Sequence, residues 1–451
     1  MTGALAALLL LPPRTFAPEP RAAGLPPEAL SRAIASHNSL LLEHCFAENV
    51  DVNVAAADGR TPLLLATSQG DAPLVERLLR AGADVDRPDR DGTTPIMVAA
   101  AHGLVDVLKL LVPRSTHIDA TDVRGQSAAH HAFAAQQYEA AEILVPLMPS
   151  MDAQGADGRD LIALACDSGN PRLITAVLSR VTEPLDWTPQ SRAALTMALS
   201  SDEAELTSLL LSKHRTQPTV EGRTIPLLAQ TIVADDQATF EKLLAAGADP
   251  NTTIPTGADK PFLTALGSNG LRDYIKGDDG ITVLMVAAAL GKPDYVRSLL
   301  AAHADKNRMT ARTKMLALYF AARTDKWRAV QMLLGSGATP DKLRIQISLA
   351  SQRAEVIKDG EPIFQTTCST GRAGFSTPAG QYVITDKQRS HKSSIYHVDM
   401  PFFMRLNCRD FGMHEGAVPN YPASHGCIRL PSAAAQKLFS EIPVGTVVTI
   451  N

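Results

Sequence analysis

The chain has 451 residues, of which 45% are hydrophobic and 20% charged, and its formal net charge is -4. At about 100 to 200 residues per domain, this length predicts two or more domains. The charge leaves no basic surplus to attract nucleic acid or an anionic membrane surface, and the five scattered cysteines contain no C-x-x-C pair of a metal or redox site.

The first residues form a short apolar run, M-T-G-A-L-A-A-L-L-L-L, followed by two prolines and a small-residue stretch that ends near Ala17. A spanning helix needs roughly 20 apolar residues, so the run predicts no stable membrane span. It has the length of a signal peptide, which we expect within residues 1–24, and export would place the protein in the periplasm or cell envelope. No Lys or Arg precedes the run, so a buried helix or a disordered leader stays open.

An internal repeat occupies most of the chain after the leader. The segments D-G-R-T-P-L-L-L-A from Asp58 and D-G-T-T-P-I-M-V-A from Asp91 start 33 residues apart, and glycines recur at the same interval at Gly125 and Gly158. Each segment continues into a second stretch of helical apolar periodicity that closes on a turn. Two short helices and a turn per period are therefore predicted.

These segments resemble the ankyrin repeat, whose T-P-L-x-x-A signature reads T-P-L-L-L-A at residues 61–66 and T-P-I-M-V-A at residues 94–99. The Asp-Gly pair suits a tight turn, and proline suits the first position of a helix. The resemblance implies an all-α solenoid of about eight or nine units over residues 25–341, with an inserted loop around residues 252–277. Its concave face would bind a protein partner.

Several reactive residue types within the repeats are expected to be structural. The histidines stand where turn or packing roles are common, and the two cysteines stand among helical apolar residues, where a buried thiol is expected. These residues are His102, His130, His131, His303, Cys45 and Cys166.

After Asp341 the helical periodicity gives way to short alternating segments such as L-R-I-Q-I-S-L and G-T-V-V-T-I. Asp359 and Gly360 form a two-residue hairpin signal between two such segments. This pattern therefore predicts a mainly-β domain over residues 342–451. Cys368 and Cys408 within it are bridged or free, and the sequence leaves both possibilities open.

This domain contains three clusters: C-S-T-G-R-A-G-F-S-T-P-A-G from Cys368, M-P-F-F-M-R-L from Met400, and M-H-E-G-A-V-P-N-Y-P-A-S-H-G-C-I-R-L-P from Met413. Together they resemble the L,D-transpeptidase (YkuD) catalytic domain, from about Arg344 to the last residue. The defining motif of that family is a histidine, a spacer and S/T-H-G-C. It reads here as His414, a spacer of nine residues, and the S-H-G-C that ends at Cys427.

The residues themselves support an acyl-transfer site. A thiol attacks a carbonyl as thiolate, and a neighbouring histidine can take its proton, so Cys427 is the predicted nucleophile and His414 its base. Backbone N–H groups around Gly426 and Cys427 would form an oxyanion hole. His425 is expected to support the site, with a role as the base as its alternative.

The family pattern implies further roles. The backbone carbonyl of Glu415 would complete the triad, although the family more often carries a small residue at this position. Ser424, Arg429 and Arg405 are predicted substrate contacts; for both arginines, pairing with an internal carboxylate is the alternative to holding a substrate carboxylate.

The resemblance implies that Cys427 forms a thioester with a peptidoglycan tetrapeptide stem and passes the acyl group to an amine, which crosslinks stems or anchors a protein. Carbapenems would acylate the same cysteine, and no metal or organic cofactor is called for. One alternative is an L,D-carboxypeptidase or crosslink hydrolase that uses the same site. Another is an ankyrin binding protein with a non-catalytic wall-recognition domain.

Overall fold

The computed structural model describes residues 25–451 except 57, 152–153, 156, 220–223, 268, 336, 338, 410 and 420. The predicted signal peptide lies outside the described residues. Two compact units make up the chain, Met1–Val181 and Thr182–Asn451. No helix in the described ranges is both long and apolar enough to cross a membrane.

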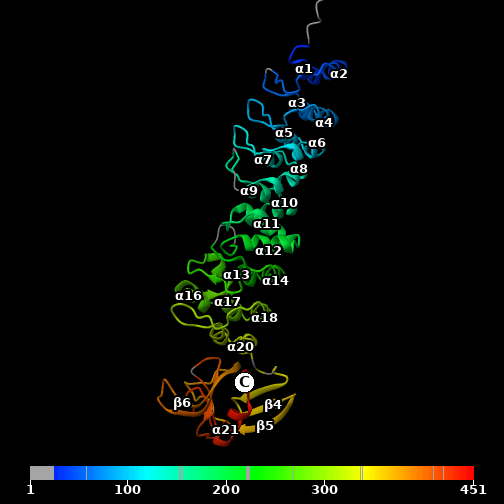
Figure 1. Ribbon diagram of the computed structural model, residues 1–451. Helices are drawn as coiled ribbons and strands as arrows, with labels where there is room; N and C mark the ends of the chain where they lie inside the picture. Colours follow the sequence, from blue (N-terminus) through cyan, green and yellow to red (C-terminus); the bar gives the residue numbers. More distant parts are fainter. Residues whose placement is uncertain are drawn as a thin grey trace, which may run out of the picture. The chain divides into compact units, whose positions relative to one another are not determined.

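The first unit consists of short helices that pack in consecutive pairs (Figure 1). The pairs are α1 (Ala29–Ala35) with α2 (Ser39–Ala47), α3 (Pro62–Ser68) with α4 (Ala72–Arg80), α5 (Pro95–Ala101) with α6 (Val105–Leu111), α7 (Ala128–Ala134) with α8 (Tyr138–Leu144), and α9 (Leu161–Ser168) with α10 (Pro171–Arg180). The 3-10 turns η1 (Val112–Arg114) and η2 (Val145–Leu147) follow α6 and α8. The first helices of neighbouring pairs also contact one another, which gives the stack a continuous core.

The repeat signature has a physical role in each helix start. The Thr61 hydroxyl accepts the N–H of Leu64 at 3.2 Å, and Pro62 occupies the first turn, where its missing N–H costs nothing. The predicted Asp-Gly turns are confirmed, because Gly59 and Gly92 have φ of +87° and +78°, a region that favours glycine.

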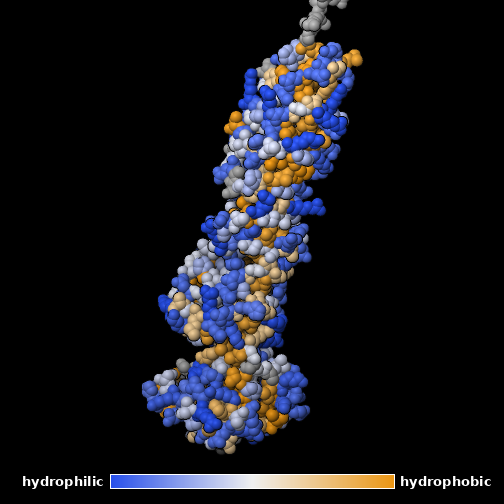
Figure 2. Space-filling model, in the orientation of Figure 1, coloured by the Kyte–Doolittle hydropathy of each residue, from blue (hydrophilic) through white to orange (hydrophobic). Residues whose placement is uncertain are grey.

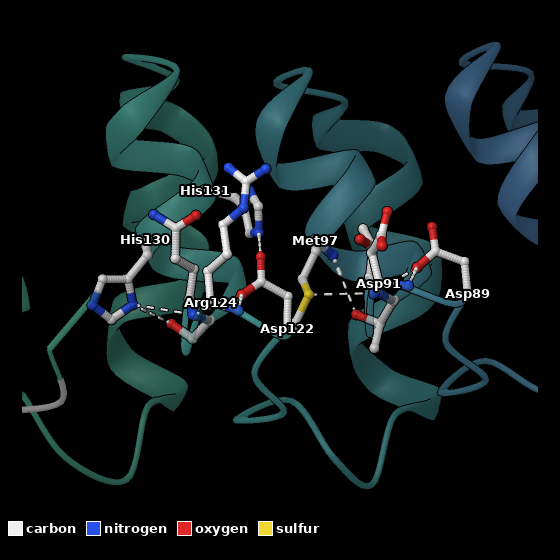
Figure 3. Close-up of polar contacts among 11 residues, drawn as sticks. Asp89, Asp91, Met97, Asp122, Arg124, His130 and His131 are labelled. Carbon is white, nitrogen blue, oxygen red and sulfur yellow. Dashed lines mark hydrogen bonds and ion pairs between the residues drawn. The ribbon is translucent and has the colours of Figure 1, made fainter. Parts of the chain in front are cut away.

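Two histidines of this unit, His130 and His131, have structural contacts of the kind predicted for them (Figure 3). His131 Nε2 lies 3.0 Å from a carboxylate oxygen of Asp122, whose other oxygen accepts the N–H groups of Arg124 and Gln126. His130 Nδ1 lies 2.8 Å from the hydroxyl of Ser127, the N-cap of α7. Cys45 and Cys166 are buried and unbridged, which confirms their expected packing role.

The second unit begins with further helix pairs. They are α11 (Pro189–Ser200) with α12 (Ala204–Lys213), α13 (Leu227–Ala234) with α14 (Gln237–Ala245), α17 (Val283–Leu290) with α18 (Pro293–Ala301), and α19 (Ala317–Arg323) with α20 (Trp327–Leu334). The insertion expected as a loop contains helices α15 (Lys260–Ala265) and α16 (Asn269–Gly277), between the short paired strands β1 (Thr253–Ile254) and β2 (Ile281–Thr282). Helix α15 forms because Asp259 caps it, accepting the N–H of Phe262 at 2.8 Å.

The C-terminal part of this unit is mainly β, as predicted. Its strands are β3 (Leu343–Ser348), β4 (Arg353–Lys358), β5 (Glu361–Thr367), β6 (Gly380–Lys392), β7 (Asp399–Leu406), β8 (Gly412–Glu415), β9 (Ile428–Leu430) and β10 (Val447–Ile450), with helix α21 (Ser432–Glu441) before β10. They form one sheet in the order β5-β4-β3-β10-β6-β7-β8-β9, in which β10 runs parallel to β3 and β8 parallel to β9. Helix α21 packs on β7 and β8, and the apolar core includes residues of both the sheet and this helix.

The predicted hairpin lies between β4 and β5. Lys358 pairs with Glu361, and the two residues between them, Asp359 and Gly360, both have positive φ, as a type I′ turn requires. Polar residues, drawn in blue, and apolar residues, drawn in orange, alternate over the visible surface (Figure 2). The β domain has an apolar core of its own, which includes Ile345, Met404 and Val448.

Helix α20 and the turn before it contact the β domain within the second unit. Both carboxylate oxygens of Asp325 accept from the Arg409 guanidinium, at 2.9 and 2.8 Å, and one also accepts from the Asn407 amide at 2.9 Å. The side-chain amide of Gln331 donates to the Gly445 carbonyl at 2.7 Å. The last helix pair is thus bonded to the turn that follows β7 and to the turn that precedes β10.

Candidate active site

The parallel pairing of β8 with β9 brings the histidine and the cysteine of the motif to one place. His414 is the register partner of Arg429, which lies two residues after Cys427. Register partners in a parallel pair project to the same face, and residues two apart in a strand also share a face. Met413 and Ile428, on the opposite face, are fully buried. Cys427 immediately precedes β9, so the pairing places the cysteine beside the strand that carries His414.

The imidazole of His414 is 7% exposed, and its Nδ1 lies 2.7 Å from the carbonyl oxygen of Glu415. A carbonyl only accepts, so Nδ1 carries the proton and Nε2 has the lone pair. Burial lowers the pKa of His414 to about 4; the Glu415 carbonyl opposes this shift, and the charges of Arg429 and His391 add to it. The ring is therefore neutral at pH 7, which is the form that accepts a proton.

His414 and Cys427 line the same cavity, which has a volume of about 360 Å³. The cavity walls come from the segment between β6 and β7, from β7 and β8, from the loop that leads into β9, and from β9 itself. The lining residues are Ser393, Ile395, Tyr396, Val398, Met400, His414, Ser424, His425, Cys427 and Arg429. Three of the predicted site residues besides the histidine and cysteine, Ser424, His425 and Arg429, thus meet at this cavity.

The loop that carries Cys427 is shaped by internal hydrogen bonds. Gly426 has φ of +110°, and its N–H donates to the Ser424 hydroxyl at 3.2 Å. The same hydroxyl donates to the carbonyl of Cys427, and Ser424 is 1% exposed. These bonds give Ser424 a role in shaping the loop, while its contact with substrate and the part of Gly426 in an oxyanion hole stay predictions.

His425 also lines the cavity. Its Nε2 lies 2.8 Å from an Arg372 guanidinium nitrogen, and its ring contacts the rings of Phe375 and Tyr396, at centroid distances of 4.9 and 4.5 Å. Arginine only donates, so Nε2 of His425 accepts this bond. With Nε2 accepting from Arg372, the arrangement favours the supporting role of His425 over a role as the base.

The two predicted substrate arginines differ. Arg429 lines the cavity, and no ion pair joins it to a carboxylate within the part of the chain that the structure describes. Arg405 is absent from the cavity lining; its guanidinium pairs with Asp386 at 2.9 Å and its side chain is 17% exposed. For Arg405 the structure therefore favours internal pairing, and the substrate-contact prediction is left to Arg429.

The remaining thiols of the domain are unbridged. Cys368 is buried, and burial raises its pKa to about 11; burial also raises the pKa of Cys408, which is half-buried. No three His, Cys, Asp or Glu residues lie close enough to hold a metal ion among the described residues. Of the five cysteines, Cys427 is the one that lines the cavity.

Sequence reasoning missed the cavity wall formed by the segment between β6 and β7. Ile395, Tyr396 and Val398 are 61%, 42% and 54% exposed, and each lines the cavity. The sequence signal was the group of apolar residues in S-S-I-Y-H-V. The two serines and the histidine in this segment argued against a strand. Its proximity to Cys427 depends on the fold of the sheet.

Family models match three parts of the chain. The model described as the L,D-transpeptidase catalytic domain (YkuD) matches residues 342–450. A model of three ankyrin repeats matches residues 30–122, and a single ankyrin repeat matches residues 279–311. The chain therefore carries ankyrin repeats followed by a domain of the L,D-transpeptidase family.

Solved structures similar to the chain include an L,D-transpeptidase from Mycobacterium smegmatis, at 20% identity and a TM-score of 0.23 over 24% of this chain and 58% of that one. An L,D-transpeptidase from Mycobacterium tuberculosis H37Rv has 24% identity and a TM-score of 0.23, over 24% of this chain and 57% of that one. The chain thus spans less than two thirds of either protein.

Proposed function

We propose that the protein is a cell-wall L,D-transpeptidase in which Cys427 is the nucleophile and His414 the general base. His414 takes the thiol proton, and the Cys427 sulfur attacks the carbonyl carbon of the third residue of a peptidoglycan tetrapeptide stem. The bond from that carbon to the nitrogen of the terminal D-alanine breaks, and the leaving amine receives the proton from His414. A thioester between the stem and Cys427 results.

In the second half of the reaction an amine replaces the leaving group. The amine of a second stem or of a protein attacks the thioester carbon, the carbon–sulfur bond breaks, and the thiol is restored. Water in place of the amine would release a tripeptide and make the enzyme a hydrolase. The reaction is complete without an electron transfer or an added cofactor.

One observation carries this proposal: a histidine that is neutral at pH 7 shares a cavity with a cysteine. The hydrogen bond from Nδ1 of His414 to the Glu415 carbonyl holds the ring in the tautomer whose Nε2 accepts a proton. A general base contributes typically 10²- to 10⁴-fold to such a reaction. The L,D-transpeptidase family match of residues 342–450 supports the same substrate class.

The other site residues receive secondary roles in the proposal. Arg429 would hold a carboxylate of the stem through its guanidinium fork, since it lines the cavity beside Cys427. The ankyrin repeats would bind a protein partner and bring the catalytic domain to it. Action on the cell wall requires export to the periplasm or cell envelope, and an N-terminally processed protein in that fraction would support it.

Incubation with tetrapeptide-bearing muropeptides and mass spectrometry of the products tests the proposal. Dimers that have lost one D-alanine are the expected product, and Cys427→Ala should abolish them. Cys408→Ala is the matched control, because Cys408 is a half-buried thiol of the same domain outside the cavity. Tripeptide without dimer would indicate a hydrolase, and full turnover by Cys427→Ala would refute the site.

A further inference from the structure

The hydroxyl of Thr377 connects two loops of the active site that lie far apart in the sequence. Thr377 is 3% exposed and lies in the loop before β6. Its Oγ1 accepts the N–H of Gly371 at 2.8 Å and donates to the carbonyl oxygen of Gly426, also at 2.8 Å. Because a hydroxyl has one proton and the Gly371 N–H is a donor, that proton belongs to the bond with Gly426.

From this connection we infer that Thr377 is a positioning residue that sets the orientation of the peptide plane between Gly426 and Cys427. A trans peptide is planar, and its C=O and N–H point in opposite directions. Holding the Gly426 carbonyl toward Thr377 therefore also fixes the direction of the Cys427 N–H. That N–H is the group whose direction matters when negative charge develops on the carbonyl oxygen under attack.

The Gly426–Cys427 peptide requires a restraint from another residue, because Gly426 itself restricts the backbone conformation very little. With φ of +110° and no side chain, Gly426 lies in a region of backbone space that glycine enters and leaves readily. The Ser424 hydroxyl restrains the neighbouring groups, the Gly426 N–H and the Cys427 carbonyl. Thr377 restrains the carbonyl between them.

Thr377 is itself held in place by a tight loop. A Cβ atom on Gly371 would lie 1.9 Å from the carbonyl oxygen of Phe375, so the loop folds back only with glycine at this position. The N–H of Arg372 donates to the Ser424 carbonyl at 3.0 Å, which ties the same loop to the one that carries Cys427. The loop that carries Thr377 is therefore itself restrained, and so is the position of the hydroxyl that bonds Gly426.

The inference rests on the proposed function and adds to it a residue that acts through the backbone of the nucleophile. Loss of the hydroxyl should leave thiolate formation by His414 intact and slow the step in which an oxyanion forms. Removing a whole oxyanion donor typically costs 10²- to 10³-fold. Loosening the donor should cost less, about 10-fold to 100-fold in kcat, with KM little changed.

Two reagents separate these steps in the full chain. Iodoacetamide alkylates a thiolate by displacement of iodide, without an oxyanion. A carbapenem acylates it through a tetrahedral oxyanion, after which the lactam carbon–nitrogen bond breaks and the nitrogen takes a proton. The rates at Cys427 are followed by intact mass, with peptide mapping to assign the cysteine.

Thr377→Val should slow carbapenem acylation about 10-fold to 100-fold and change alkylation by less than about twofold. Thr377→Ser, which keeps the hydroxyl, should recover most of the acylation rate. Thr385→Val is the matched control: Thr385 is also buried, and its hydroxyl accepts the Cys408 N–H at 3.1 Å, outside the cavity. Both rates should stay at wild-type values in this variant.

Equal slowing of both reagents in Thr377→Val, or wild-type acylation, would overturn the inference. If Thr377→Val fails to fold by circular dichroism, the same two rates in Thr377→Ala decide. A wild-type protein that is alkylated at Cys427 but never acylated and never turns over muropeptides would refute the proposed function itself. The two failures are distinguishable, because the wild-type protein tests the proposed function and the Thr377 variants test the inference.

Discussion

Histidines have different surroundings in the ankyrin repeats and in the β domain, although the residue type is the same. In the repeats, His131 bonds the carboxylate of Asp122 and His130 bonds the hydroxyl that caps its own helix. In the β domain, His414 bonds a backbone carbonyl and lines a cavity that also holds a thiol. The chemistry of a histidine therefore depends on the groups that the fold places beside it.

The helix caps of the repeats and the buried hydroxyls of the active site differ in how far apart in the sequence the bonded residues lie. Helix caps in the repeats join residues three positions apart, as in Thr61 and Leu64. In the β domain, buried hydroxyls join loops about fifty residues apart, as in Thr377 with Gly426 and Ser369 with Tyr421. The start of a repeat helix such as α3 therefore depends on its neighbours in the sequence, whereas the active-site loops are joined by residues far apart in the chain.

Replacing each histidine by glutamine gives the sharpest test of this comparison. His414→Gln should lower kcat/KM in the muropeptide assay about 10²- to 10⁴-fold, because the general base is lost. His131→Gln should leave kcat/KM within about twofold, since its ring serves a turn in the repeats. Circular dichroism would establish that both variants are folded, and an active His414→Gln protein would remove the distinction between the two histidines.

Acidification should destabilise the β domain through His414. Its folded pKa of about 4 lies below the ordinary value of 6.5, so the unfolded chain binds the proton first. The contribution of neutral His414 to the free energy of unfolding is complete above about pH 6.5 and is lost as the pH falls toward 4. The total loss is on the order of 3 kcal/mol, and this contribution changes no further below pH 4. Urea unfolding of the domain at several pH values, in the wild type and His414→Gln, measures it; an equal acid loss in both proteins would contradict the assignment.

Glycine-to-alanine substitutions at positive φ compare the backbone of the two regions. Gly426→Ala forces a side chain into φ of +110°, which should cost about 1–3 kcal/mol or shift the Cys427 loop, and lower kcat about 10-fold or more. Gly82→Ala is the control, with φ of +88° in a repeat turn and no atom within 4 Å of the added Cβ. It should lower the stability of the repeats and leave kcat unchanged; equal kcat values in both variants would count against the proposed site.

The contact between the last helix pair and the β domain should have the smallest effect. Asp325→Ala removes the bonds to Arg409 and Asn407, and because the pair is partly exposed the loss should be about 1 kcal/mol or less in the unfolding of the β domain. Asp235→Ala, which breaks an exposed ion pair to Lys292 within the repeats, should leave that transition unchanged. Calorimetry of the full chain measures the unfolding of the β domain in both variants. A larger change in that transition for Asp235→Ala than for Asp325→Ala would show that the Asp325 contact does not stabilise the domain.

Much of the fold could be predicted from short stretches of sequence. The T-P segments predicted helix starts, and the Asp359-Gly360 pair predicted its hairpin, because both depend on backbone preferences of a few neighbouring residues. Helix α21 and the helices of the insertion were missed. The segment S-A-A-A-Q-K-L-F-S-E carries a helical pattern, which the alternating segments on either side of it obscured.

The candidate site was predictable in part. His414 and Cys427 were identified by their motif, and the structure places both at one cavity. Arg405 and Arg429 looked alike in sequence, and they differ because Asp386 lies across from Arg405 in the paired strands β6 and β7. Strand pairing of this kind depends on register, which the sequence of one strand does not contain.

Composition and short spacings are enough to identify the repeat, the change from helices to strands near residue 342, and the residue types of the proposed chemistry. The tertiary structure alone decided that β8 runs parallel to β9, that Arg429 lines the cavity while Arg405 pairs internally, and that Thr377 reaches Gly426. A hydrogen bond or a cavity depends on distances of a few ångströms between individual atoms. Those distances arise only when segments far apart in the chain pack against a common core.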